Sequence, residues 1–126
     1  KDVICWRAIE AVGLVSADMP PEGSRKLAQR LLWMMRDESG GNAWSAPEML
    51  GEIVRNNIDT LTDIIPIIGS FHDEQMFTGG VVRALGRIAE IRPYLVIPLK
   101  ALIVHYINDP DPSIRENAVY ANGLLN

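Results

Sequence analysis

The residues best suited to recognition in this 126-residue chain are its tryptophans and arginines, because these two types supply much of the binding energy at protein interfaces. Trp6 and Trp44 each stand seven residues before a glycine, and Arg83 and Arg87 lie about one helical turn apart. Together with three polar or amphipathic residues at related spacings, they are predicted to line one partner-binding groove. The full set is Trp6, Glu10, Trp44, Glu48, Arg83, Arg87 and Tyr120.

Two structural alternatives remain open for this set. Both tryptophans can pack between neighbouring helical units, as large aromatic side chains do in protein cores. Arg83 can form an ion pair with a glutamate of an adjacent unit and then has no part in binding. A tryptophan packed between units is buried, whereas one that lines a groove keeps part of its ring exposed.

Other residues with chemical capacity are explained more simply by structure. The run His72-Asp73-Glu74 stands where a helix is expected to begin, and acidic residues there complement the helix dipole. Cys5 is expected to be a small, buried apolar side chain and not a nucleophile. Gly79-Gly80 follows no strand and precedes no phosphate-loop lysine, so close helix approach is its expected role. The sequence therefore predicts no catalytic residue, no metal site and no cofactor.

The composition restricts the class of protein and of partner. Hydrophobic residues make up 48% and charged residues 22% of the chain, values typical of a globular domain, here one domain over residues 1–126. The net charge of −4 includes no basic cluster, so nucleic acid is not an expected partner. No apolar run approaches the roughly 20 residues of a membrane helix, so no membrane association is expected. A single cysteine fits a reducing compartment, and a cytoplasmic location is expected.

Helical spacing of apolar residues predicts seven helices and no strand. They are expected at 3–16, 21–36, 45–56, 60–71, 74–91, 93–108 and from 112 onward. Pro66 falls inside the fourth helix, so a kink or broken turn is expected there. Pro98 stands a few residues after the start of the sixth helix. Two starts carry capping signals: Ser45 with Glu48 forms the pattern of a capping box, and Asp111 precedes Pro112.

Four of these helices share one pattern around a glycine. The glycines stand at 13, 51, 86 and 123, separated by 38, 35 and 37 residues. Four positions around each glycine are apolar and often small, and they predict one buried face per helix. Counted from the glycine, this face holds Ala8, Ala46, Val81 and Ala118 at minus five, Ile9, Pro47, Val82 and Val119 at minus four, Ala11, Met49, Ala84 and Ala121 at minus two, and Val15, Ile53, Ile88 and Leu125 at plus two. Ile4 and Val12 extend the face of the first helix. Such periodicity is typical of stacked repeats.

The last helix and its lead-in at 109–112 resemble the HEAT-repeat family in its short form, and so does the sequence at 84–86. Arg115 stands at the family's arginine position, whereas Cys5 and Ala43 stand there in the first two units. Over nearly the whole chain, the resemblance implies an all-α, right-handed α-solenoid of about three and a half helical hairpins. It also implies that the second helix of each hairpin lines the concave face.

For function, the resemblance implies a non-catalytic scaffold or adaptor that binds a protein or peptide in the concave groove. The alternative is a protein that handles a small molecule or chromophore, because bilin lyases are HEAT-like and two tryptophans can stack a flat ligand. HEAT-like alkylpurine DNA glycosylases are a third relative, which the acidic balance disfavours. The HEAT-like deoxyhypusine hydroxylases are excluded because the chain lacks their repeated His-Glu pairs.

The first and last helices lack the polar outer face that terminal repeats normally have. We therefore expect either that these residues belong to a longer array or that a terminal helix packs on another molecule. Self-association through the exposed terminal helices is one form of such packing.

Overall fold

The computed structural model describes residues 2–37 and 45–126, and all regular structure in these two segments is helical. The α-helices are α1 (Val3–Ala17), α2 (Pro21–Arg36), α3 (Ala46–Asn56), α4 (Ile65–Gly69), α5 (Gln75–Ala89), α6 (Lys100–His105) and α7 (Pro112–Leu124). Three short 3-10 helices accompany them: η1 (Thr62–Ile64), η2 (Pro93–Leu95) and η3 (Ile97–Leu99). The prediction of an all-α chain with seven helices is confirmed for the described segments.

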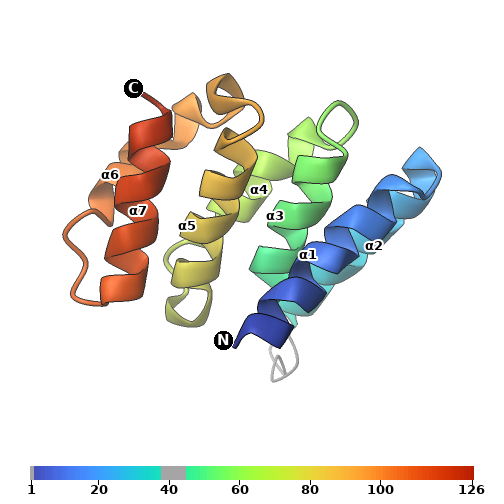
Figure 1. Cartoon of the computed structure of the whole chain (residues 1–126), viewed down its shortest axis with the longest axis horizontal. Coiled ribbons are helices and arrows are strands. Elements are labelled where there is room, and N and C mark those ends of the chain that lie inside the picture. Colours follow the sequence, from blue (N-terminus) through green and yellow to red (C-terminus); the bar gives the residue numbers. More distant parts are fainter. Residues whose placement is uncertain (1, 38–44) are drawn as a thin grey trace.

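The helices lie in two rows (Figure 1). The glycine row consists of α1, α3, α5 and α7, which pack side by side in chain order, each on the next. The opposite row consists of α2, α4 and α6, which pack against α3, α5 and α7 respectively. The glycine row therefore places residues that are about 35 positions apart in the sequence on neighbouring helices.

Prolines shorten the opposite row. The helix expected at 60–71 is broken into η1 and α4, with Pro66 in the first turn of α4, so the predicted break is confirmed. The single helix expected at 93–108 is wrong, because the chain forms η2, η3 and then α6. Pro93 and Pro98 cannot donate backbone hydrogen bonds; Pro93 is the first residue of η2 and Pro98 the second residue of η3, so 3-10 turns replace the expected α-helix. By contrast, α5 runs unbroken through Gly79-Gly80.

The two capping predictions have opposite outcomes. Asp111 has an extended backbone, and its Oδ1 accepts a hydrogen bond of 2.8 Å from the Ser113 amide at the start of α7, as predicted. The capping box at Ser45 is wrong, because its side chain makes no capping hydrogen bond. The physical reason is the backbone of Ser45, whose ψ of 10° departs from the extended conformation that an N-cap requires.

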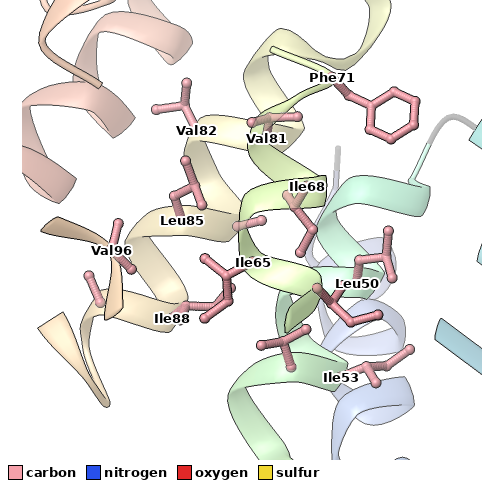
Figure 2. Close-up of a cluster of buried hydrophobic side chains, with 14 of the residues drawn as sticks. Leu50, Ile53, Ile65, Ile68, Phe71, Val81, Val82, Leu85, Ile88 and Val96 are labelled. Carbon is pink, nitrogen blue, oxygen red and sulfur yellow. The ribbon is translucent and has the colours of Figure 1, made fainter. Parts of the chain in front are cut away.

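One apolar core lies between the rows and is continuous from α2 to α7. In Figure 2, Ile65 and Ile68 of α4 lie between Leu50 and Ile53 of α3 and the side chains of α5. Leu50, Ile53 and Ile68 are fully buried. Burial of each such side chain contributes roughly 1.5–3 kcal/mol to folding, so this core holds the two rows together. Among the described helices, none combines the length and the apolar character needed to cross a bilayer.

Glycines determine how closely neighbouring helices of the glycine row approach. A Cβ atom on Gly51 would lie only 2.6 Å from the Ala84 Cβ and 2.8 Å from the Ala84 Cα. A Cβ on Gly86 would meet the Ala121 Cβ at 3.5 Å, an ordinary contact. The contact between α3 and α5 therefore requires glycine at position 51, whereas the contact between α5 and α7 tolerates a small side chain at position 86.

The apolar face predicted for α1 is mostly exposed, which corrects the expectation that it is buried. Ile4, Ala8, Ala11 and Val15 face solvent, and the residues that are buried are Ile9, Gly13 and Ser16. The reason is the position of α1 in the glycine row: it packs on α3 along one flank, and no described helix covers the opposite flank. The matching faces of α3 and α5 are buried between neighbours on both sides.

Gly51→Ala is expected to lower the free energy of unfolding by about 1–3 kcal/mol, because the new methyl group overpacks the contact with Ala84. Alanine's helix propensity, better by about 1 kcal/mol, offsets only part of this loss. Gly86→Ala is the matched control and is expected to be neutral or stabilising. Urea unfolding followed by circular dichroism measures both, and equal stability of the two variants would contradict the close approach described here.

Candidate functional site

A groove with a volume of about 670 Å³ crosses all four helices of the glycine row near the start of α3, α5 and α7. Trp6 comes from α1, Glu48 from the first turn of α3, Arg83 from α5, and Ile114 and Asn117 from α7. Because four consecutive helices each contribute side chains, the groove depends on the row and not on any one hairpin.

Trp6 and Arg83 form the wall of the groove. The Arg83 guanidinium carbon lies 3.8 Å from the centroid of the Trp6 ring, so the cation stacks on the aromatic face. Trp6 belongs to α1 and Arg83 to α5, and this pair therefore bridges over α3, which lies between them. Both side chains are half-buried. Trp6 is thus a groove residue with part of its ring exposed.

The floor of the groove is formed where Gly80 of α5 meets the first turn of α3. A Cβ atom on Gly80 would lie 2.9 Å from the Pro47 Cγ and would collide with the Glu48 carboxylate. Glu48 is 5% exposed and lines the groove, so it lies in the floor. The expectation that Gly79-Gly80 serves close helix approach is supported by this geometry.

A network of ion pairs fills the same side of the glycine row beyond the groove, toward the ends of α3 and α5. Arg87 Nε and Nη2 each donate a 2.9 Å hydrogen bond to a carboxylate oxygen of Glu52, which is a bidentate pair. The Glu52 side chain is only 3% exposed. Hydrogen bonding to Glu52, together with the charges of Glu90 and Glu10, raises the pKa of Arg87, so the guanidinium remains charged.

Glu90 joins three helices at the end of this network. Its carboxylate accepts hydrogen bonds from Arg55 of α3, from Arg87 of α5 and from the Tyr120 hydroxyl of α7. Burial favours the neutral acid, but the Tyr120 hydrogen bond and the two arginine charges outweigh it and lower the pKa of Glu90. The same hydrogen bond raises the pKa of Tyr120.

The six predicted site residues that the structure describes do not form one site. Trp6, Glu48 and Arg83 meet at the groove. Arg87 and Tyr120 belong to the ion network, where they connect neighbouring helices and do not line the groove. Glu10 is half-buried on α1, and its charge acts on Arg87. Trp44 lies outside the described residues. Arg83 stacks on Trp6, and the arginine of α5 that pairs with a glutamate of the adjacent helix is Arg87.

Several site residues were not singled out from the sequence. In the network these are Glu52, Arg55 and Glu90, and a sequence signal for them exists. One residue after the glycine, the second repeat has Glu52 and the third has Arg87; four residues after it, the second has Arg55 and the third has Glu90. This exchange of sign predicts cross-repeat pairs. The groove residues that were missed have no comparable signal, because their positions show no exchange of charge between repeats. They are Ser45, Gln75, Met76, Asp111, Ser113, Ile114 and Asn117.

His72 has a structural role. Its Nδ1 lies 2.7 Å from the Tyr106 hydroxyl oxygen, and its backbone carbonyl accepts hydrogen bonds from Tyr106 and Thr78. These contacts connect the turn before α5 to the end of α6. Over residues 2–37 and 45–126, no three metal-binding side chains come together.

Comparison of the chain with protein-family models, with curated proteins and with solved structures finds no match.

Glu90→Gln is expected to lower the free energy of unfolding by about 1 kcal/mol at pH 7, because the partly exposed carboxylate loses charge-assisted hydrogen bonds. Since the pKa of Glu90 is lowered on folding from its ordinary value of 4.5, its stabilising contribution is present above pH 4.5. That contribution is lost as the pH falls through the folded-state pKa. The stability difference between wild type and variant should therefore shrink below pH 4.5.

Urea unfolding between pH 3 and pH 7 measures this difference, and Glu116→Gln, at an exposed position of α7 beyond its first turn, controls for the removal of one carboxylate. A difference between wild type and Glu90→Gln that does not change with pH would refute a charged, hydrogen-bonded Glu90.

Proposed function

We propose that the chain is a right-handed, HEAT-like α-solenoid that acts as a non-catalytic adaptor and binds a peptide segment of a partner protein in its groove. The observation that supports this function best is the Trp6–Arg83 pair in the wall of a groove that crosses four helices. Tryptophan and arginine are the residues most enriched at the energetic centres of interfaces. The one cysteine, Cys5, is free and lines the groove, which fits the proposed cytoplasmic location.

The dimensions of the groove suit an extended peptide. Three spacings between packed helices, at about 9 Å each, give a path of roughly 27 Å from α1 to α7. An extended segment of about eight residues covers this distance. The lining changes along the path from Trp6 and Arg83 to Met76 and Ile114, so neighbouring positions of a peptide would meet polar and apolar surroundings in turn.

Arg83 determines which peptide is preferred. A guanidinium stacked on an aromatic ring lies parallel to the ring, and its N–H donors point outward in its own plane. There they can hold a carboxylate in bidentate fashion. The exposed part of the Trp6 ring and Met76 offer apolar contact in the same groove. We therefore propose a ligand segment in which an acidic residue stands beside an aromatic or large aliphatic residue.

A second candidate function is the binding of a flat organic molecule such as a linear tetrapyrrole. The volume of about 670 Å³ falls within the range of small-molecule sites, and one wall is an aromatic ring. In this proposal Trp6 stacks on the ligand, and Arg83 pairs with a ligand carboxylate.

The peptide proposal is tested with a displayed library of random peptides selected on the wild-type chain, followed by fluorescence anisotropy with the selected sequences. Arg83→Glu is expected to weaken binding at least tenfold, because it removes a charged hydrogen-bond donor and places a like charge near the acidic ligand residue. Arg30→Glu, at an exposed position of α2 outside the groove, makes the same charge change and should keep wild-type affinity. Equal affinities of the two variants would exclude the groove as the binding site.

The flat-ligand proposal is tested by titration with biliverdin, followed by its absorbance. Saturable binding that Trp6→Leu weakens at least tenfold is the expected result, because leucine keeps an apolar wall but removes the stacking surface. Binding that is unchanged in Trp6→Leu, or that does not saturate, would reject this second function. Circular dichroism of Trp6→Leu establishes that loss of binding is not loss of fold.

A further inference from the structure

The helices α1 and α7 carry the same apolar face, but only α7 has it covered. Four positions match when each helix is aligned on its own glycine, Gly13 or Gly123. The matching pairs are Ile4 with Ile114, Ala8 with Ala118, Ala11 with Ala121, and Val15 with Leu125. In α7 these residues are buried or half-buried, with both alanines at 0% exposure. In α1 the same positions are exposed, including 78% of Ile4 and 64% of Val15.

The partner of this face inside the molecule is the preceding helix of the glycine row. A Cβ atom added to Gly86 of α5 would lie 3.5 Å from the Ala121 Cβ of α7, and one added to Gly79 would lie 3.5 Å from the Ile114 Cγ1. Ala84 of α5 meets Gly51 of α3 in the corresponding way. The glycine of one helix thus receives the alanine that stands two residues before the glycine of the next helix, and this contact occurs twice.

Both halves of this contact also occur once without a partner. Among the described residues, no atom outside its own stretch of helix lies within 4 Å of a Cβ added to Gly123 of α7, and Val119, one turn earlier on the same helix, is 52% exposed. Ala11 of α1 is exposed. A glycine flank therefore remains open on α7, and the alanine flank that fits it remains open on α1.

We infer that α1 of a second copy of this chain packs on α7 of the first, with Ala11 against Gly123, and so repeats the contact between α5 and α7. A second copy is the favoured occupant because one chain carries both halves of a contact that it already makes twice internally. The two faces differ, so the contact is heterologous. Each added copy leaves one α1 face and one α7 face open, and association continues as an open series without stopping at a dimer.

The experiment uses two variants, each of which places an arginine in one of the faces. Ala11→Arg blocks the α1 face, and Gly123→Arg blocks the α7 face. Both positions are exposed, so both variants are expected to keep wild-type circular dichroism. Thr62→Arg, at an exposed position of η1 in the middle of the opposite row, is the matched control for the added charge. Masses are measured by sedimentation at concentrations up to about 1 mM, where weak specific association is populated.

The wild type and Thr62→Arg are expected to show a mass that rises above 14.0 kDa with concentration and does not level off at two copies. Each blocked variant alone should remain at 14.0 kDa. An equimolar mixture of the blocked variants should form a dimer and nothing larger, because one intact α7 face and one intact α1 face are then available.

Three results would each overturn the inference: a wild type that is monomeric throughout, a blocked variant that still associates alone, or a mixture that remains monomeric.

Discussion

The structure depends on how closely α3 can approach α5. At Gly51 and at Gly80 there is no room for a side chain, because Ala84 and Pro47 with Glu48 occupy the space. This approach brings side chains of α1 and α5 within reach of each other above α3, and Trp6 can therefore stack on Arg83. The groove thus depends on contact between α1 and α5, which are not neighbours in the row. A bulkier residue at Gly51 or Gly80 would push α5 away from α3 and so separate Arg83 from Trp6.

The same side of the glycine row has two regions with different physical characters. Toward the ends of α3 and α5, bidentate and shared ion pairs satisfy Glu52, Arg87 and Glu90. These charge-assisted pairs connect α3 to α5 across the row. Toward the helix starts, the groove opens and its lining includes Gly79 and Gly80. The groove is therefore confined to one half of the row.

The sequence predicts most of the glycine row and part of the site. The bounds of α1, α2, α3, α5 and α7 agree with the predicted ranges to within about two residues, because each has a long apolar stripe and clear ends. The rest of the opposite row is predicted less well, because α-helix is replaced by 3-10 turns at or just before Pro66, Pro93 and Pro98. The lengths of these turns depend on packing. The exposed stripe of α1 was assigned to the core, because an apolar stripe does not specify whether a neighbour covers it.

The register of α1 explains why Trp6 reaches the groove. Gly51 and Gly86 meet residues two before the next glycine, whereas Gly13 meets Glu52, one residue after Gly51. Compared with the other contacts, α1 is thus displaced by three residues, or about 4.5 Å, toward the end of α3. If Gly13 met the residue two before Gly51, as the other glycines do in their contacts, Trp6 would lie level with a position before the first residue of α3. The displacement places it level with Ser45, beside Glu48. Buried Ser16 stabilises this register, because its hydroxyl accepts a 3.0 Å hydrogen bond from Asn57 at the end of α3.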